Sequence, residues 1–280
     1  MGAIITLTSD FGLSDPYVAA MKGVILGING EARLIDICHA VRPQNIQQAA
    51  FIIGTAYPYF PQKTIHLVVV DPGVGTERRA LILMVPGGLF VAPDNGVLSH
   101  VLQPFLAANI SEKCKVSLKK GLKPGAEIDA IRITNPKYFR GTVSPTFHGR
   151  DIFAPVAASL SLGVSPGEFG EPLTSVEAIP VSRPAKLPNG SLAGHVIYID
   201  AFGNLITDMR LEDLPSGQPV NIEVKNRFIS GLRRTYADGN GLLAIIGSSG
   251  YLEIALKGGN AALLLDAQPG DEVRLITGNV

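Results

Sequence analysis

The segment that most constrains the fold is residues 64–79, a nearly unbroken apolar run that ends in a carboxylate, a glycine-containing turn and two arginines. Runs such as residues 67–70 are typical of strands buried on both faces of a parallel sheet. Ligands of open α/β sheets bind just beyond the carboxyl ends of such strands. We therefore expect a rigid strand to present Asp71 to a pocket, with Arg78 or Arg79 folding back toward it.

Strand and helix patterns alternate through the first part of the chain. The expected strands are residues 3–7, 33–37, 65–70, 80–85, 89–92 and 128–133. The expected helices are residues 17–26, 45–57, 94–102 and 151–162. Strands separated by helices indicate an α/β domain with a mostly parallel, mixed central sheet that helices flank.

Residues 180–190 contain three prolines and a glycine turn and are typical of a linker. The pattern of apolar and turn-forming residues changes after them. Beyond the linker, short apolar segments are separated by Gly, Pro, Asn and Asp, and no convincing helix lies among them. The expected strands are residues 195–200, 205–208, 220–224, 242–246, 252–256, 261–265 and 272–276. This pattern favours a smaller all-β, barrel-like domain. The predicted domains are residues 1–183 and 184–280.

Composition excludes several classes of protein. The formal net charge is zero, whereas a nucleic-acid-binding surface needs a basic excess. No apolar stretch reaches the length of a membrane span, and the N-terminus lacks the basic start of a signal peptide. Cys38 and Cys114 are too few for a disulfide framework. We therefore expect a cytoplasmic protein that binds neither nucleic acid nor membrane.

A few polar residues stand where the predicted strands end or a helix begins. Asp10 follows the first strand and could accept hydrogen bonds from the vicinal hydroxyls of a ribose, or it could cap a turn. Asp36, in the second strand, could be a cap or an ion-pair partner. His148 lies in the loop before the last helix of the first domain, where Gly149 permits a close approach. Asp10 and His148 are therefore candidate site residues, with both interpretations of Asp10 open.

Two loops of the β-rich part carry groups suited to a ligand. In Asp200-Ala-Phe-Gly-Asn204, Phe202 could stack on an adenine ring, and the Asn204 amide offers a donor and an acceptor. The alternative is an Asx turn. Ser248 and Ser249 lie in a glycine-flanked loop that suits a carboxylate, and the alternative there is an ordinary hairpin loop.

Taken together, these segments resemble the S-adenosyl-L-methionine (SAM) hydroxide adenosyltransferases, the adenosine-forming SAM hydrolases related to fluorinase and chlorinase. The matching segments run in order along nearly the whole chain. They are Thr8-Ser-Asp-Phe-Gly12, Asp71-Pro-Gly-Val-Gly-Thr-Glu-Arg78, Ala92-Pro-Asp-Asn-Gly96, Thr146-Phe-His-Gly-Arg-Asp151, Asp200-Ala-Phe-Gly-Asn204 and Ser248-Ser-Gly-Tyr251.

The resemblance implies a catalytic triad of Asp71, Arg78 and His148. In the halogenating branch a different side chain replaces the aspartate, and a long insertion precedes the segment that matches residues 92–96. Here the aspartate is present and the connection at Pro86-Gly-Gly88 is short. Both features favour water over halide as the nucleophile.

The resemblance also implies substrate contacts and an assembly. Substrate-binding residues would be Asp10 at the ribose, Phe202, Asn204 and Tyr236 at the adenine, and Asp200 and Ser248 at the methionine, with Ser249 nearby. Ser249 stands where the halogenases place an arginine for the methionine carboxylate. The family implies a homotrimer in which each active site lies between the α/β domain of one subunit and the β-domain of its neighbour.

The predicted reaction is hydrolysis of SAM to adenosine and L-methionine by in-line attack of water or hydroxide on C5′. The positively charged sulfur of SAM is already a good leaving group, because methionine departs as a neutral thioether. The difficulty therefore lies in positioning and deprotonating the water. Pairing with Arg78 makes Asp71 a weaker base, so we expect Asp71 and His148 to orient the water or accept its proton together. Neither a metal nor a cofactor is required, since SAM is the substrate.

Three alternatives stay open at this point. Asp10, Asp71 and His148 could instead hold a metal ion in a metal-dependent hydrolase, because carboxylates and imidazole are ordinary ligands. The chain could be a non-catalytic protein that binds SAM or adenosine. It could also be a SAM-dependent 5′-halogenase.

Overall fold

The computed structural model describes residues 2–215 and 219–277, and the chain divides into two compact units, residues 1–181 and 182–280. The first unit is an α/β domain with a mixed central sheet, and the second is a smaller, barrel-like β domain. The two units confirm the predicted fold class, an α/β domain followed by a smaller all-β, barrel-like domain. None of the helices in the described ranges is long and apolar enough to span a membrane.

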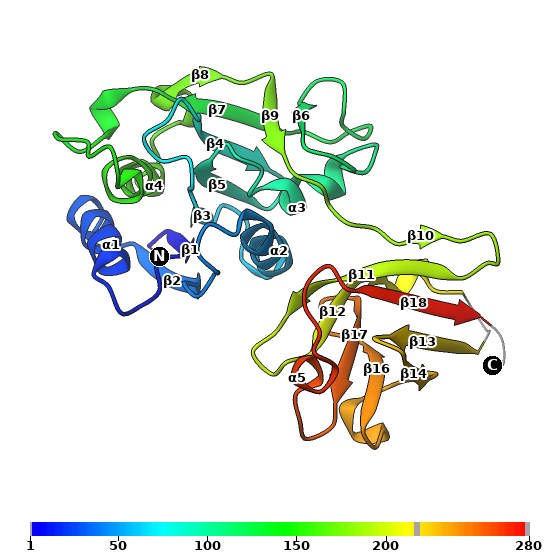
Figure 1. Ribbon diagram of the computed structural model, residues 1–280. Coiled ribbons are helices and arrows are strands. Elements are labelled where there is room, and N and C mark those ends of the chain that lie inside the picture. Colours follow the sequence, from blue (N-terminus) through cyan, green and yellow to red (C-terminus); the bar gives the residue numbers. More distant parts are fainter. Residues whose placement is uncertain (1, 216–218, 278–280) are drawn as a thin grey trace. The chain divides into compact units, whose positions relative to one another are not determined.

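A seven-stranded sheet forms the centre of the first unit (Figure 1). Its strand order is β2-β1-β3-β5-β4-β7-β8. The first four strands in this order are parallel to their neighbours, and the remaining pairs are antiparallel. The bounds are β1 (Ile4–Ser9), β2 (Arg33–Cys38), β3 (Ile65–Val69), β4 (Ala80–Val85), β5 (Gly88–Pro93), β7 (Asp129–Ile133) and β8 (Gly170–Pro172).

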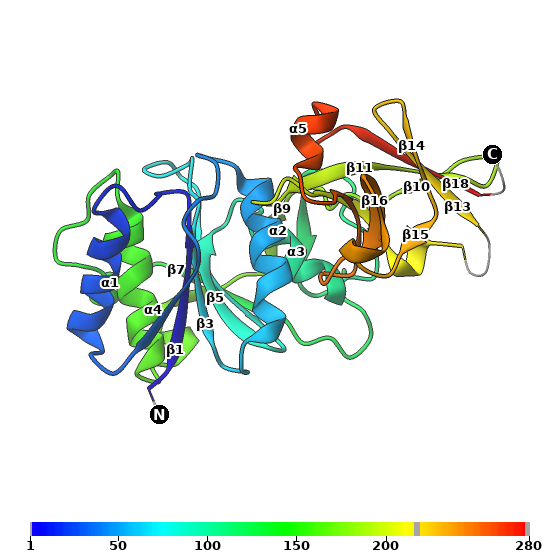
Figure 2. The ribbon, with the colours of Figure 1, turned by 90° about the horizontal axis from the view of Figure 1, so that it is seen from below.

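Helices cover both faces of this sheet (Figure 2). Helices α1 (Tyr17–Ile28) and α4 (Ala154–Ser161) lie on one face, and α2 (Ile46–Ala56) and α3 (Ser99–Leu102) lie on the other. Side chains of β3 and of Val70, which follows it, alternate between the two cores: Leu67 and Val69 face the α1 side, whereas Val68 and Val70 face the α2 side. Because both faces are covered, this strand is apolar except for His66, whose Nδ1 lies 2.8 Å from the Thr6 hydroxyl.

A small two-stranded sheet, β6 (Cys114–Ser117) with β9 (Ser175–Ala178), packs into the core on the α2 side. Neither strand was expected from the sequence. Both are short, and in each only alternate side chains are well buried, as Val116 and Val176 are. Each strand therefore contains too few apolar residues to be recognised from the sequence.

The second unit is one nine-stranded sheet, in which β14 also contacts β16. The strand order is β14-β13-β18-β11-β12-β17-β16-β15, and β10 pairs with β11. The bounds are β10 (Ala185–Lys186), β11 (Leu192–Ile199), β12 (Leu205–Arg210), β13 (Val220–Val224), β14 (Arg227–Ser230), β15 (Leu232–Arg233), β16 (Leu242–Ile246), β17 (Tyr251–Leu256) and β18 (Glu272–Thr277).

One predicted strand of this unit is wrong, because residues 261–265 form the short helix α5 (Ala261–Leu265). The Asn260 side chain caps it by accepting a hydrogen bond from the Leu263 amide at 2.8 Å. Ala261 and Leu265 are buried while Leu263 is 81% exposed, so one helical face packs inward. An all-apolar pentapeptide carries no period that distinguishes helix from strand.

The predicted helix over residues 94–102 is also wrong in its first half, since α3 begins only at Ser99. Asn95 Oδ1 accepts a hydrogen bond from the Val97 amide at 3.1 Å, and Gly96 has a φ of 95°. Residues 94–96 therefore form a turn at the end of β5 and do not start a helix.

Candidate functional site

Asp71 lies just past the carboxyl end of β3, at the start of a tight turn. Gly75 in this turn has a φ of 78°, and a Cβ there would lie 2.6 Å from the Pro145 carbonyl oxygen. Only glycine fits both constraints. The sequence interpretation of this glycine as a turn residue is thus supported by its geometry. The turn reverses the chain and brings the side chain of Arg78 back onto Asp71.

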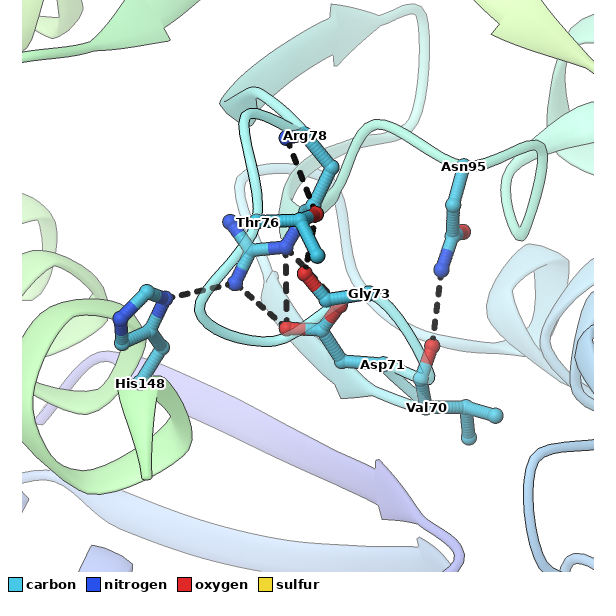
Figure 3. A network of polar contacts seen from close by, with 7 residues as sticks. All are labelled: Val70, Asp71, Gly73, Thr76, Arg78, Asn95 and His148. Carbon is cyan, nitrogen blue, oxygen red and sulfur yellow. Dashed lines mark hydrogen bonds and ion pairs between the residues drawn. The ribbon is translucent and has the colours of Figure 1, made fainter. Parts of the chain in front are cut away.

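The Asp71–Arg78 contact is two-pronged (Figure 3). Arg78 Nε donates to Asp71 Oδ1 at 2.8 Å, and Arg78 Nη2 donates to Asp71 Oδ2 at 2.5 Å. The side chains are 6% exposed for Asp71 and 11% for Arg78. The guanidinium also lies 5.1 Å from the centre of the Phe153 ring. A bidentate pair that is largely shielded from water holds both groups in fixed orientations.

His148 reaches the same place from a distant loop. It directly precedes a π-helical turn, Gly149–Phe153, that leads into α4. A Cβ on Gly149 would lie 3.2 Å from Val69 Cγ1, so the loop packs directly on the end of β3. As a result, His148 Nδ1 lies 2.8 Å from Arg78 Nη2 (Figure 3).

The protonation of His148 follows from this contact. A guanidinium has only donors, so His148 Nδ1 must accept, and the imidazole proton is then on Nε2. Burial lowers the pKa of His148, and the charge of Arg78 lowers it further. The neutral imidazole is therefore favoured, with an N–H donor at Nε2 and with Nδ1 already occupied.

Asp151 supports the loop that carries His148. Its carboxylate is fully buried and accepts hydrogen bonds from Arg150 Nε at 2.7 Å and from the Ser144 amide at 2.9 Å. Arg150 Nη2 also donates at 2.8 Å, and Arg140 Nη1 donates at 3.1 Å. These bonds outweigh the effect of burial, so the pKa of Asp151 is lowered. Asp151 thus ties residues 140–150 together and is not the N-cap of a helix.

The other strand-end carboxylates have local partners. Asp10 follows β1, which is parallel to β3, so Asp10 and Asp71 come after strands that end at the same sheet edge. Asp10 Oδ2 accepts a hydrogen bond from the Gln44 amide at 2.8 Å. Asp36 forms an ion pair with Lys22 at 2.6 Å, and its Oδ1 lies 3.1 Å from His39 Nε2. Asp10 therefore holds the backbone of a distant loop at Gln44, and its ribose contact stays a prediction.

In the second unit, the loop of residues 200–204 is an Asx turn. Asp200 Oδ1 accepts from the amides of Phe202 and Asn204, each at 2.9 Å, and Asn204 Nδ2 donates to Asp200 Oδ2 at 2.9 Å. This turn leaves the Phe202 ring 77% exposed. Ser248 and Ser249 lie in the hairpin loop between β16 and β17. The contacts of these residues with adenine and methionine stay predictions.

Glu253 is a feature of this region that sequence reasoning missed. It is buried in the centre of β17, and its Oε1 accepts a hydrogen bond from the Tyr236 hydroxyl at 2.5 Å. Burial raises the pKa of Glu253, and the neighbouring charge of Asp200 raises it too. The available signal was a lone glutamate inside the apolar run of residues 251–256. Glu253 therefore holds the hydroxyl of Tyr236, one of the predicted substrate residues.

A metal-binding group of three or more His, Cys, Asp or Glu residues does not occur among residues 2–215 and 219–277. Within the Asp71 cluster, both carboxylate oxygens and the His148 Nδ1 are engaged by Arg78. Asp10, Asp71 and His148 are therefore not gathered into such a group in the described part of the chain.

Comparison with known proteins covers nearly the whole chain. Residues 5–170 match the SAM hydroxide adenosyltransferase N-terminal domain, and residues 194–274 match the C-terminal domain of the same family. An (R)-S-adenosyl-L-methionine hydrolase of Salinispora arenicola is 36% identical over 98% of each chain. A fluorinase of Nocardia brasiliensis is 25% identical over 98% of this chain and 97% of its own.

A solved structure agrees with these sequence matches. It is an uncharacterized conserved protein from Thermotoga maritima, with a TM-score of 0.84 and 33% identity. The alignment covers 97% of this chain and 99% of that one. Both units described above are therefore shared with a chain of similar length.

Proposed function

Since this chain belongs to the SAM hydroxide adenosyltransferase family, we propose that it hydrolyses S-adenosyl-L-methionine to adenosine and L-methionine. The observation that carries the proposal is the contact of Arg78 with both Asp71 and His148 at the end of β3. We propose the (R) form of SAM as the substrate, as in the name of the Salinispora relative.

The bond changes balance without a cofactor. The oxygen of water or hydroxide forms a bond to C5′ as the C5′–S bond breaks. The sulfonium takes the electron pair and leaves as the neutral thioether of methionine, so no acid has to protonate it. One proton leaves the attacking water. The demanding step is therefore activation of the nucleophile, which needs positioning and a proton acceptor.

The three triad members take different roles in this step. Asp71 keeps lone pairs beyond those used by Arg78, and we assign it to accept the hydrogen of the attacking water. His148 offers its Nε2–H as a donor that orients the water oxygen. Arg78 fixes both groups, and its charge favours hydroxide over water. Hydroxide and sulfonium neutralise each other on reaction, so a water-poor site favours the step.

Further parts of the proposal follow from the family. Water is the nucleophile in place of halide because Asp71 is present and β4 joins β5 through a tight turn, in which Val85 pairs with Gly88. The assembly is a cytoplasmic homotrimer with active sites at subunit interfaces. The substrate-binding residues are Asp10, Asp200, Phe202, Asn204, Tyr236, Ser248 and Ser249.

The proposal is tested by incubating the full-length protein with SAM and separating the products by chromatography. We expect adenosine and methionine in equal amounts, also after treatment with a chelator and in the presence of chloride. Tight SAM binding without products would instead identify a binding protein. A 5′-chloro-adenosine product would identify a halogenase, and loss of activity on chelation would identify a metal enzyme.

The pH dependence of hydrolysis provides a second check. Protonated His148 cannot accept from Arg78, so activity should fall as His148 protonates. Because burial and the Arg78 charge lower the pKa of His148 from its usual 6.5, the acidic limb of kcat/KM should have its midpoint below 6.5. A profile measured between about pH 4 and 8 tests this. A His148-dependent limb centred at or above 6.5, absent from His148→Gln, would contradict the assignment.

A further inference from the structure

We propose that Asp94 and Asn95, two consecutive residues at the end of β5, clamp both ends of the Asp71 turn, which makes Asn95 a positioning residue for hydrolysis. The inference rests on the proposed function for its kinetic consequence. Its structural part concerns residues 70–79 and can be tested without substrate. It also gives a role to the segment Ala92-Pro-Asp-Asn-Gly96, for which the triad has no use.

Asn95 holds the first end of the turn. Its Nδ2 donates to the Val70 carbonyl oxygen at 2.9 Å (Figure 3). Val70 is fully buried and directly precedes Asp71, and the pairing of β3 with β5 has already ended at Leu67. Beyond the last residue that pairs with β5, the Asn95 amide therefore fixes the backbone of Val70, the residue directly before Asp71.

Asp94 holds the second end of the turn. Its amide donates to the Arg79 carbonyl oxygen at 2.8 Å, and its Oδ2 forms an ion pair with Arg79 Nη2 at 2.5 Å. Asp94 is itself fixed, because its Oδ1 accepts from the Glu177 amide at 2.8 Å. Arg79 directly follows Arg78. The residue before Asp71 and the residue after Arg78 are thus both attached to one dipeptide.

Bonds inside the turn are local and cannot fix its position in the sheet. The Val74 amide donates to the Asp71 carbonyl at 3.2 Å, and the Thr76 amide donates to the Gly73 carbonyl at 3.1 Å. These bonds preserve the shape of the turn if it moves as a unit. A shift of about 1 Å at a reacting group can reduce the rate about 10²-fold. The anchors at its two ends therefore matter for the rate.

Asn95→Asp is the most informative variant because it keeps the size and the Oδ1 acceptor for the Val97 amide and replaces the NH₂ donor with a negatively charged oxygen. A carboxylate oxygen then faces the Val70 carbonyl, and that end of the turn is released. The matched control is Asn135→Asp. Asn135 has the same pattern, with Nδ2 donating to the Glu168 carbonyl at 2.7 Å and Oδ1 accepting from the Lys137 amide at 3.1 Å.

We expect Asn95→Asp to lower kcat about 10- to 10²-fold, with KM for SAM close to wild type and the protein still folded at the assay temperature. Hydrogen exchange measured by mass spectrometry should be faster in the peptide of residues 71–79. Asn135→Asp should change neither quantity. Asn95→Ala, which removes the side chain without adding a charge, should shift kcat and exchange in the same direction.

Several outcomes would show that Asn95 does not position the Asp71 turn. Unchanged kcat in both Asn95 variants, an effect confined to KM, or a kcat loss without faster exchange in residues 71–79 would overturn the inference. An equal kcat loss in Asn135→Asp would show a general effect on folding and would overturn it too. Failure of the proposed function is recognised separately, because wild-type protein would then leave SAM intact, while the exchange measurement would still test the clamp.

Discussion

Replacing Asp71 with asparagine is expected to lower kcat for SAM hydrolysis by about 10²–10⁴-fold, the range that a general base contributes. Asparagine has nearly the same shape and can still accept one hydrogen bond from Arg78, so the turn should stay in place. The amide, however, carries no charge and is a very poor proton acceptor. The measurement is initial-rate kinetics together with calorimetric titration of SAM.

SAM affinity should stay within a few-fold of wild type, since Asp71 acts on the water. Asp271→Asn is a suitable control, because Asp271 pairs with Lys225 in the second unit, away from the triad residues along the chain. Wild-type kcat in Asp71→Asn would remove Asp71 from the mechanism. A loss of SAM binding without a loss of kcat would reassign it to substrate recognition.

Replacing Arg78 with alanine is expected to abolish most activity and also to lower the free energy of unfolding by about 3–5 kcal/mol. The carboxylate of Asp71 is only 6% exposed, so removing its partner leaves a buried charge unpaired. His148 loses its hydrogen-bond donor at the same time. Urea unfolding followed by circular dichroism gives the stability change, with two transitions fitted if the units unfold separately.

Two variants separate the charge effect from a general packing effect. Adding Asp71→Asn to Arg78→Ala should restore part of the lost stability, because the unpaired charge is gone, but no activity. Lys115→Ala breaks an exposed pair with Glu177 and should cost at most about 1 kcal/mol. A similarly small loss in Arg78→Ala would mean that the Asp71–Arg78 pair is effectively solvated.

Much of the α/β domain and part of the candidate site follow from local sequence. An apolar run ending in Asp71 and a glycine turn predicted both the buried strand and a returning arginine. The local pattern alone could not decide between Arg78 and Arg79, since both follow the turn, and only the family resemblance singled out Arg78. The two ion pairs of the folded chain distinguish them, because Arg79 pairs with the buried carboxylate of Asp94 and Arg78 pairs with Asp71.

The parts that local sequence could not provide depend on long-range contacts. His148 meets Arg78 from 70 residues away, and Asn95 meets Val70 from 25 residues away. Without the resemblance to a family, His148 would have been one loop histidine among several. The role of Glu253 could not be predicted because a single charged residue in a strand gives no periodic pattern. Its partner Tyr236 also lies 17 residues earlier in the chain.

Attack of water on C5′ is tested most directly by wild-type hydrolysis of SAM in water enriched in oxygen-18, with mass spectrometry of both products. We expect adenosine to gain one oxygen-18 atom, at the 5′ position, and methionine to gain none, because water attacks C5′ and methionine leaves with its sulfur and carboxylate unchanged. Adenosine without label, or label in methionine, would contradict attack of solvent water at C5′.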